Sequence, residues 1–268
     1  MIERVRPGAT AARARVVLFD FDGTLSVIRS GWVEVMVAMM AEALAGLGSG
    51  ETPERIRSIA EDAVLRLNGK PTIHQMIELA AQVRERGGTP LDPIEYKRMY
   101  LARLNGRIAD RRRELRDGKG PPGAYLVPGA RELLEALREK GLRLYLASGT
   151  DEPSLREEAR LLGVDGYFDG GVFGAPDDDR AFSKALLLEG ILARGECRGE
   201  ELLAFGDGDV EIRNTKEAGG VAVGVATAEP ECRVVDEAKR RRLVGVGADY
   251  IVPNFLGREE LLGALFPS

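Results

Sequence analysis

The apolar positions of this chain follow two different periods, which divide it into two kinds of region. The run Val16–Phe19 is continuous and begins with β-branched residues, which is typical of a strand buried on both faces of a sheet. Between about residues 30 and 117, apolar residues recur at spacings of three and four, which predicts a helical region without strands. The expected helices cover 33–47, 56–67, 73–83 and 94–115, and Pro53, Pro71 and Pro93 stand where helix starts tolerate proline.

A second change of period follows the Pro/Gly-rich segment 118–130, which is typical of a linker. Beyond it, short apolar runs alternate with helical patterns. The expected strands are 142–147, 202–205, 221–225 and 250–252, and the expected helices are 130–140, 152–162, 182–194, 210–218, 231–242 and 257–265. Strands that alternate with helices predict a parallel sheet with helices on both faces.

The first strand is separated from the other strands by the whole helical region, and this order predicts an insertion. We therefore expect an α/β fold in which residues 15–27 and 126–268 form a Rossmann-like domain with a parallel sheet. An all-helical cap domain is expected at 28–125. Residues 1–14 are predicted to be a frayed N-terminal tail.

Composition narrows the possible partners. The 268 residues carry a net charge of −5, which offers no general attraction to nucleic acid or to an anionic membrane. The basic runs 111–113 and 239–242 lie on predicted helices without interleaved aromatic residues, so we expect solvated faces rather than a nucleic-acid surface. The longest apolar stretch, 31–48, contains Glu34 and Glu42 and therefore predicts an amphipathic helix, not a membrane span.

The two cysteines, Cys197 and Cys232, are too few for a disulfide framework or a zinc cluster, and we expect both to be reduced thiols. The charged N-terminal segment has no long apolar core, so no signal peptide is predicted and the expected location is the cytoplasm. A monomer and a homodimer are both compatible with the sequence.

Acidic residues follow the first predicted strand directly, in the stretch DFDGT of residues 20–24. Ligands of open α/β sheets bind beyond the carboxyl ends of the strands, so Asp20 and Asp22 are expected to face one cavity. Two carboxylates this close repel each other unless a cation or a shared proton offsets them. Asp20 suits a metal ligand and nucleophile, Asp22 a general acid and base, and Gly23 a close approach of the backbone to a ligand. An ordinary Asp/Gly turn is the alternative.

Polar residues also follow two later strands. Ser148-Gly149-Thr150 would cradle an anion with a hydroxyl and free backbone N–H groups, although a helix N-cap explains it as well. Asp207, Asp209 and Glu211 follow the next strand. Three carboxylates at a strand end favour a shared divalent cation such as Mg²⁺, and the alternative is a solvated acidic helix start.

Lys184 lies in the first turn of the expected helix 182–194, where a cation opposes the helix dipole. A lysine at this position would neutralise a phosphate group and the nucleophile. The alternative is an ordinary solvated lysine.

In this order, the four motifs resemble those of the haloacid dehalogenase superfamily, over residues 15–27 and about 126–268. The resemblance implies that Asp20 is a nucleophile that becomes an aspartyl phosphate. It implies that Asp22 protonates the leaving oxygen and then activates water. The implied Mg²⁺ ligands are Asp20, Asp207, Glu211 and the backbone carbonyl of Asp22, and the implied phosphate-binding residues are Gly23, Thr24, Ser148, Gly149 and Lys184.

Two positions depart from the family pattern or divide the family. The last acidic position is more often Asp, whereas here it is Glu211, with Asp209 as a rival for the outer metal shell. The true dehalogenases lack a carboxylate at the position of Asp22. Because a dehalogenase has no leaving alkoxide to protonate, Asp22 favours phosphoryl transfer.

The helical insertion resembles the type-1 cap of phosphoglycolate phosphatase-like members, and such caps exclude water and contact the leaving group. Within 68–76, Gly69 breaks the helical pattern, although an ordinary helix–turn–helix corner is the alternative. Candidate substrate contacts are Arg29, Lys70, Thr72 and Gln75, and Trp32 lines the mouth or belongs to the core. His74 is the single histidine and is expected to be a surface or partly packed residue.

The sequence therefore predicts a Mg²⁺-dependent phosphatase that acts on a small phosphorylated metabolite through an aspartyl phosphate. One alternative is a phosphomutase of the same fold, which needs a cap that shuts water out. Another is a catalytically idle binding or regulatory member, which requires the loss of a key residue, and none is lost. A dinucleotide-binding enzyme is disfavoured because no Gly-x-Gly-x-x-Gly follows the first strand.

Overall fold

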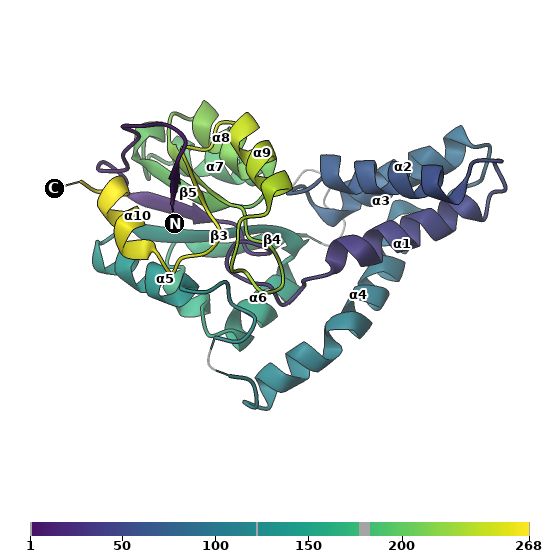
Figure 1. Ribbon diagram of the computed structural model, residues 1–268, viewed down its shortest axis with the longest axis horizontal. Helices are drawn as coiled ribbons and strands as arrows, with labels where there is room; N and C mark the ends of the chain where they lie inside the picture. Colours follow the sequence, from purple (N-terminus) through teal and green to yellow (C-terminus); the bar gives the residue numbers. More distant parts are fainter. Residues whose placement is uncertain (1, 122, 177–182, 268) are drawn as a thin grey trace.

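The centre of the protein is a seven-stranded sheet in the order β1–β7–β6–β5–β2–β3–β4 (Figure 1). The computed structural model describes residues 2–121, 123–176 and 183–267, and all statements below concern these residues. All neighbouring strands are parallel except β1, which pairs antiparallel with β7 at one edge. The strands are β1 (Glu3–Arg4), β2 (Val16–Phe19), β3 (Arg143–Asp151), β4 (Gly171–Ala175), β5 (Leu202–Gly206), β6 (Val221–Val225) and β7 (Tyr250–Val252). The predicted α/β fold with a mostly parallel sheet is confirmed.

Helices cover both faces of the sheet, because alternate residues of each strand point to opposite sides. Val17 and Phe19 of β2 pack with the helices of one face, and Val16 and Leu18 pack with those of the other. The first face carries α5 (Ala130–Glu139), α6 (Glu152–Leu161) and α10 (Arg258–Leu265). The second carries α7 (Lys184–Ala193), α8 (Asp209–Glu217) and α9 (Glu237–Gly245).

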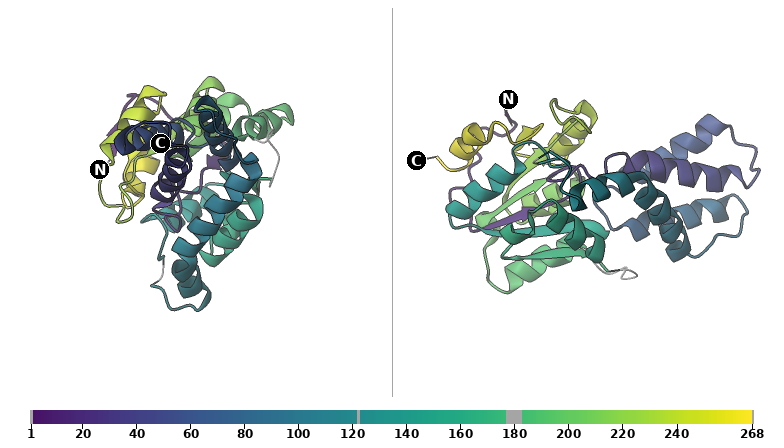
Figure 2. Two further views of the ribbon diagram at one scale, coloured as in Figure 1. Left: turned by 90° about the vertical axis from the view of Figure 1, so that its right-hand side faces the viewer. Right: turned by 90° about the horizontal axis from the view of Figure 1, so that it is seen from below.

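Four helices inserted between β2 and β3 form a bundle that projects from the sheet (Figures 1 and 2). They are α1 (Trp32–Ala45), α2 (Pro53–Arg66), α3 (Thr72–Glu85) and α4 (Pro93–Arg116). Their buried residues form an apolar cluster of their own, separate from the clusters of the sheet. The helical insertion is as predicted, while the domain boundaries at 27/28 and 125/126 stay a prediction.

The chain passes between the bundle and the sheet twice, and the two passages pair with each other. Val27 N–H donates to Tyr125 O at 2.8 Å, and Val127 N–H donates to Leu25 O at 2.9 Å. The two ends of the insertion are therefore adjacent.

The prediction of a frayed N-terminal tail is wrong. Glu3–Arg4 form β1, and two hydrogen bonds of 2.6 Å join the Arg240 guanidinium to the Glu3 carboxylate. Farther along, Ala11 is buried in the core. Two paired residues are too short for a strand pattern to be visible in the sequence.

Two other elements differ from the prediction. The strand β4 was not expected, because its sequence is rich in glycine; a Cβ on Gly174 would lie 2.4 Å from Glu152 Cα, so the strand needs glycine there. The helix expected at 231–242 is α9, which begins at 237 because the Asp236 carboxylate accepts from the N–H groups of Ala238 and Lys239.

The remaining expected elements form within a few residues of their predicted ends. Residue 182 of the expected helix 182–194 and residue 122 of the expected linker lie outside the described residues. No helix in the described part of the chain is long and apolar enough to cross a membrane.

A buried carboxylate joins the bundle to the sheet domain. Glu158 of α6 is fully buried and accepts from Arg29 Nε at 2.8 Å and from Arg29 Nη2 at 3.0 Å. Arg112 of α4 donates to the same carboxylate through Nε at 3.1 Å and through Nη2. One carboxylate therefore binds two guanidinium groups from different segments.

We expect Glu158→Gln to lower the free energy of unfolding by about 3 kcal/mol, because it removes the carboxylate that binds the buried Arg29 and the half-buried Arg112 guanidinium groups. The measurement is urea unfolding followed by circular dichroism. The matched control is Glu157→Gln on the same helix, whose exposed pair with Arg116 should contribute less than about 1 kcal/mol. Equal losses for both variants would contradict this role of Glu158.

Candidate active site

The site begins where β2 ends. Asp20 follows the strand directly, and its N–H donates to Phe205 O of β5 at 2.9 Å, so sheet pairing continues up to this residue. Gly23 then turns the chain with a φ of 75°, a left-handed conformation that favours glycine. A Cβ on Gly23 would lie 2.3 Å from Asp207 Oδ2. Glycine is therefore required by conformation and by the closeness of Asp207.

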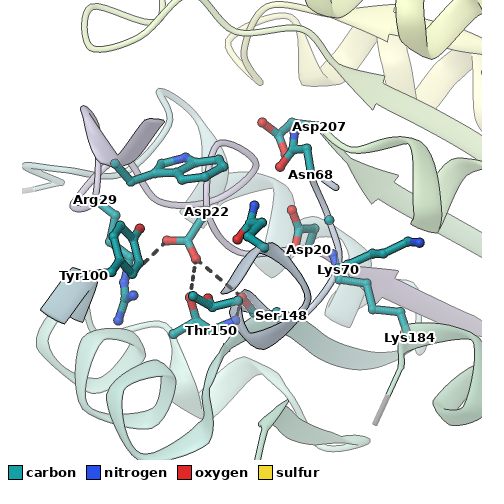
Figure 3. Close-up of a pocket in the computed structure, with 15 residues that line it drawn as sticks. Asp20, Asp22, Arg29, Asn68, Lys70, Tyr100, Ser148, Thr150, Lys184 and Asp207 are labelled. Atoms are coloured by element: carbon teal, nitrogen blue, oxygen red, sulfur yellow. Dashed lines mark hydrogen bonds and ion pairs between the residues drawn. The ribbon is translucent and has the colours of Figure 1, made fainter. Parts of the chain in front are cut away.

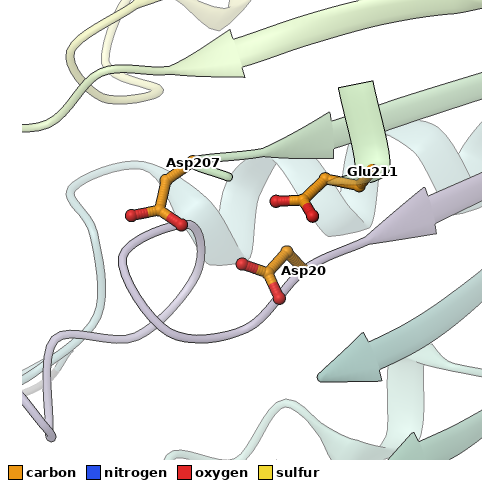
Figure 4. Close-up of side chains that lie close together, drawn as sticks. All are labelled: Asp20, Asp207 and Glu211. Atoms are coloured by element: carbon orange, nitrogen blue, oxygen red, sulfur yellow. The ribbon is translucent and has the colours of Figure 1, made fainter. Parts of the chain in front are cut away.

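Three carboxylates meet at this edge of the sheet. Asp20, Asp207 and Glu211 each place an oxygen within 4.8 Å of the others, and all three residues are buried (Figure 4). Burial is the main cause of an Asp20 pKa well above its usual range; Lys184 acts to lower that pKa, and the charges of Glu211 and Asp207 raise it further. Carboxylates this close need a positive charge beside them.

Lys184 supplies part of that charge. Its Nζ lies 2.6 Å from Asp20 Oδ1 and 3.0 Å from Glu211 Oε2. Burial acts to lower the Lys184 pKa, but the charges of Asp20 and Glu211 outweigh burial and raise it, so the ammonium persists. The side chain is 3% exposed, which excludes the alternative of a solvated lysine.

The donor set of the cluster fits a divalent cation. Lys184 and Lys239, whose Nζ lies 2.9 Å from Asp207 Oδ2, supply two positive charges against three carboxylates, and carboxylate oxygens are the ligands that hard divalent cations prefer. Glu211 is held in place by Gly208 N–H, which donates to Oε1 at 2.7 Å. Asp209 lies outside the cluster, with Oδ1 3.5 Å from Arg242 Nε and a side chain that is 38% exposed.

Asp22 sits in a network of hydroxyl groups. Thr150 Oγ1 donates to Asp22 Oδ2 at 2.8 Å, and Ser148 Oγ lies 3.4 Å from the same oxygen (Figure 3). Asp22 Oδ1 lies 3.8 Å from Arg29 Nε and has no hydrogen-bond partner in the described part of the chain. Burial raises the pKa of Asp22 to about 6, against the opposing effect of Arg29. The carboxyl group can therefore gain and lose a proton near neutral pH.

Ser148 and Thr150 belong to a strand and not to a helix N-cap. The strand β3 continues to Asp151, and the expected helix start comes after it. Thr150 N–H donates to Ser148 Oγ at 3.1 Å. The two hydroxyl side chains therefore face Asp22 across the ends of β2 and β3.

A cavity of about 70 Å³ lies between the sheet edge and the bundle (Figure 3). From the sheet domain it is lined by Asp20, Asp22, Ser148, Gly149, Thr150, Lys184 and Asp207. From the insertion it is lined by Arg29, Trp32, Asn68, Gly69, Lys70, Thr72, Gln75 and Tyr100. All four cap candidates that the sequence singled out thus reach the same cavity as Asp20.

Some predicted site residues lie elsewhere. Gly23, Thr24 and Glu211 do not line the cavity. Thr24 is fully buried, and its hydroxyl has no hydrogen-bond partner among the residues described. Glu211 does not reach the cavity itself but contacts Lys184, which lines it. His74 is half-buried outside the cavity, as expected, and burial lowers its pKa.

Two cavity residues were not selected from the sequence. Asn68 lies in the segment 68–76, from which other residues were selected as substrate contacts. Its place beside those residues was therefore the sequence signal that could have identified it. Tyr100 lies on α4 at the helical spacing of the core residues Tyr96 and Leu104, and this pattern is typical of a core position.

The prediction that both basic runs form solvated faces is wrong for several members. Arg111 Nη1 donates to the carbonyls of Ile28 and Ser30 at 2.8 and 2.9 Å, and Arg112 binds Glu158 as described above. Lys239 is half-buried and pairs with Asp207. The spacing of residues along a helix does not show which hydrogen-bond acceptors and carboxylates other segments of the chain place next to these side chains.

The comparisons with known proteins agree with this arrangement. A sequence profile of the family described as haloacid dehalogenase-like hydrolase matches residues 14–219. A phosphorylated carbohydrates phosphatase from Thermotoga maritima is 26% identical over 169 residues, which make up 62% of this chain and 73% of the relative.

Two solved structures share the fold at low sequence identity. A predicted phosphoglycolate phosphatase from Haemophilus somnus has a TM-score of 0.57 and 17% identity, over 93% of this chain and 98% of that chain. CbbY from Rhodobacter sphaeroides in complex with phosphate has a TM-score of 0.56 and 23% identity, over 94% of this chain and 99% of that chain. These two likenesses concern the fold alone. Because the family profile spans most of the chain, including both aspartates after β2, Lys184 and the acidic residues after β5, the protein belongs to the haloacid dehalogenase-like hydrolases.

Proposed function

We propose that the protein is a Mg²⁺-dependent phosphatase that hydrolyses a small phosphorylated metabolite. The observation that carries the proposal is the buried Asp20 carboxylate, 2.6 Å from the Lys184 ammonium, in a cavity that Asp22 also lines. A nucleophile, a fixed positive charge and a group for proton transfer therefore share one cavity.

In the first step of the proposed reaction, the Asp20 carboxylate attacks the phosphorus atom and the bond to the leaving oxygen breaks. Asp22 starts protonated and gives its proton to that oxygen, so a neutral alcohol departs. Lys184 and the Ser148 hydroxyl bind the transferring phosphoryl oxygens. Asp20 then carries an aspartyl phosphate.

In the second step, the Asp22 carboxylate takes a proton from a water molecule, whose oxygen attacks the phosphorus atom. The bond between phosphorus and Asp20 breaks, which restores both aspartates and releases inorganic phosphate. When bound, Mg²⁺ would supply positive charge that draws the phosphate group to the carboxylate, and its proposed holders are Asp20, Asp207, Glu211 and the Asp22 carbonyl.

The insertion side of the cavity supplies the proposed contacts to the leaving group. Two nitrogens of Arg29 are already hydrogen-bonded to Glu158, so Lys70, Thr72 and Gln75 are assigned this role first. Trp32 and Tyr100 add aromatic surface to the same cavity. Phosphorylated carbohydrates are the first substrates to screen, because the relative from Thermotoga maritima is named for them.

Asp20→Asn should abolish hydrolysis of an aryl phosphate and of a panel of phosphorylated metabolites, by a factor on the order of a thousand or more, because the amide is no nucleophile. EDTA should abolish turnover of the wild type, and added Mg²⁺ should restore it. A variant that keeps the wild-type rate would contradict the role of Asp20. A wild type that is inactive on the whole panel and binds no Mg²⁺ would point to an idle binding protein instead.

The acceptor of the phosphoryl group is tested by a single turnover in oxygen-18-labelled water. A phosphatase releases phosphate with one labelled oxygen, because water attacks the phosphorus atom of the aspartyl phosphate. Unlabelled transfer to a second oxygen of a substrate would assign a phosphomutase.

The two acidic positions after Asp207 are expected to differ in Mg²⁺ affinity. Glu211→Gln should weaken Mg²⁺ binding by about tenfold or more, because Glu211 belongs to the carboxylate cluster. Asp209→Asn should leave the affinity close to that of the wild type, because Asp209 faces Arg242. Calorimetric titration of Mg²⁺ gives both values, and the reverse order would assign Asp209 as the metal residue.

The contact between Gly149 and the Lys70 backbone is expected to control how closely the bundle approaches the sheet. A Cβ on Gly149 would lie 2.6 Å from Lys70 O and 3.0 Å from its carbonyl carbon, so Gly149→Ala must push the segment away. We expect a loss of kcat/KM of about tenfold or more, since cavity geometry is displaced. The control is Gly106→Ala on α4, where an added methyl group meets nothing within 4 Å. Equal kcat/KM for the two variants would contradict this interpretation.

A further inference from the structure

Lys239 lies beside the carboxylate cluster, although sequence patterning places it on a solvated helix face. Its Nζ is 2.9 Å from Asp207 Oδ2 and 2.9 Å from Glu229 Oε1, and its side chain is 17% exposed. Asp236 caps α9 by accepting from the Lys239 N–H at 2.9 Å, which holds the residue in the first turn of the helix. The lysine is thus directed at the cluster from a fixed backbone position.

The three carboxylates are divided between two lysines. Asp20 and Glu211 share Lys184, whereas Asp207 is paired with Lys239. Lys239 is in turn shared with Glu229, which comes from the segment between β6 and α9. A Cβ on Gly23 would lie 3.2 Å from Glu229 Oε1, so Glu229 is also a neighbour of the turn that follows Asp20.

We propose that Lys239 is a positioning residue that competes with the divalent cation for Asp207 and thereby sets how tightly the protein holds that cation. The inference rests on the proposed function, in which Asp207 is one of the residues that hold Mg²⁺. An ammonium 2.9 Å from a carboxylate repels a second cation that binds the same group, and burial limits the screening of that repulsion by salt. Without a cation, the ammonium offsets the repulsion that would drive Asp207 away from Asp20.

Glu229 acts in the opposite direction. It shares the Lys239 ammonium and adds a negative charge near the cluster, and both effects favour a bound cation. Neutralising Lys239 and neutralising Glu229 should therefore change the affinity for Mg²⁺ in opposite senses. A purely structural role of the pair predicts weaker binding in both variants.

The test is a calorimetric titration of Mg²⁺ into the full chain, stripped of metal and held at constant pH and ionic strength. Lys239→Met should bind Mg²⁺ about tenfold more tightly, and Glu229→Gln should bind it several-fold more weakly, on the order of fivefold. Lys239→Arg keeps the charge and should stay near the wild-type affinity. Thermal unfolding of the metal-free proteins should show a lower Tm for Lys239→Met than for Lys239→Arg.

The matched control is Lys216→Met. Lys216 Nζ lies 2.7 Å from Asp249 Oδ2, and its side chain is 21% exposed, so this variant also breaks a half-buried lysine–aspartate pair. Because that pair is not part of the carboxylate cluster, the variant should lower Tm without changing the Mg²⁺ affinity.

Unchanged or weaker Mg²⁺ binding by Lys239→Met overturns the proposal. If Lys239→Met does not fold, Glu229→Gln is the deciding variant. Mg²⁺ binding by Glu229→Gln that is as tight as in the wild type, or tighter, also overturns the proposal. A wild type that binds no Mg²⁺ would contradict the proposed function and, with it, this inference. If the wild type binds Mg²⁺, the affinities of the variants test the role of Lys239 alone.

Discussion

Carboxylates buried within contact of one another are unstable unless positive charge faces them, and the layout of the whole sheet edge follows from this constraint. Asp20, Asp207 and Glu211 meet because the parallel strands β2 and β5 are neighbours and end together. The compensating lysines come from the first turns of α7 and α9, which cover one face of the sheet. A parallel sheet brings helix starts and strand ends to the same edge, so the fold supplies both charges at once.

The same constraint governs the joint between the bundle and the sheet. The buried Glu158 carboxylate binds two guanidinium groups, one from the segment after β2 and one from α4. Arg29 continues this network to Asp22, whose Oδ1 it approaches at 3.8 Å. The environment of Asp22 thus depends on the docking of α4, which lies at the other end of the insertion in the sequence.

Features carried by neighbouring residues could be predicted, and features that need distant partners could not. The run Val16–Phe19 marks a buried strand, and the acids after it mark the sheet edge, because strand ends converge in this fold. Tyr100 and Lys239 look like ordinary helix residues, since nothing near them in sequence records the cavity or Asp207. The strand β1 depends on the pairing of two residues with β7, and the late start of α9 depends on the Asp236 cap. Features this short produce no periodic pattern of apolar residues in the sequence.

The two segments that connect the helical insertion to the sheet pair with each other beside Val27 and Val127, and this pairing has a consequence for the evolution of such a protein. Because the ends of the insertion are neighbours, closing the chain around the bundle costs nearly the same entropy whether the bundle is long or short. Helices can be lengthened, lost or exchanged there without moving the strand ends that carry Asp20 and Asp207. Selection can therefore rebuild the side of the cavity that the insertion lines while the side that the sheet domain lines is inherited unchanged.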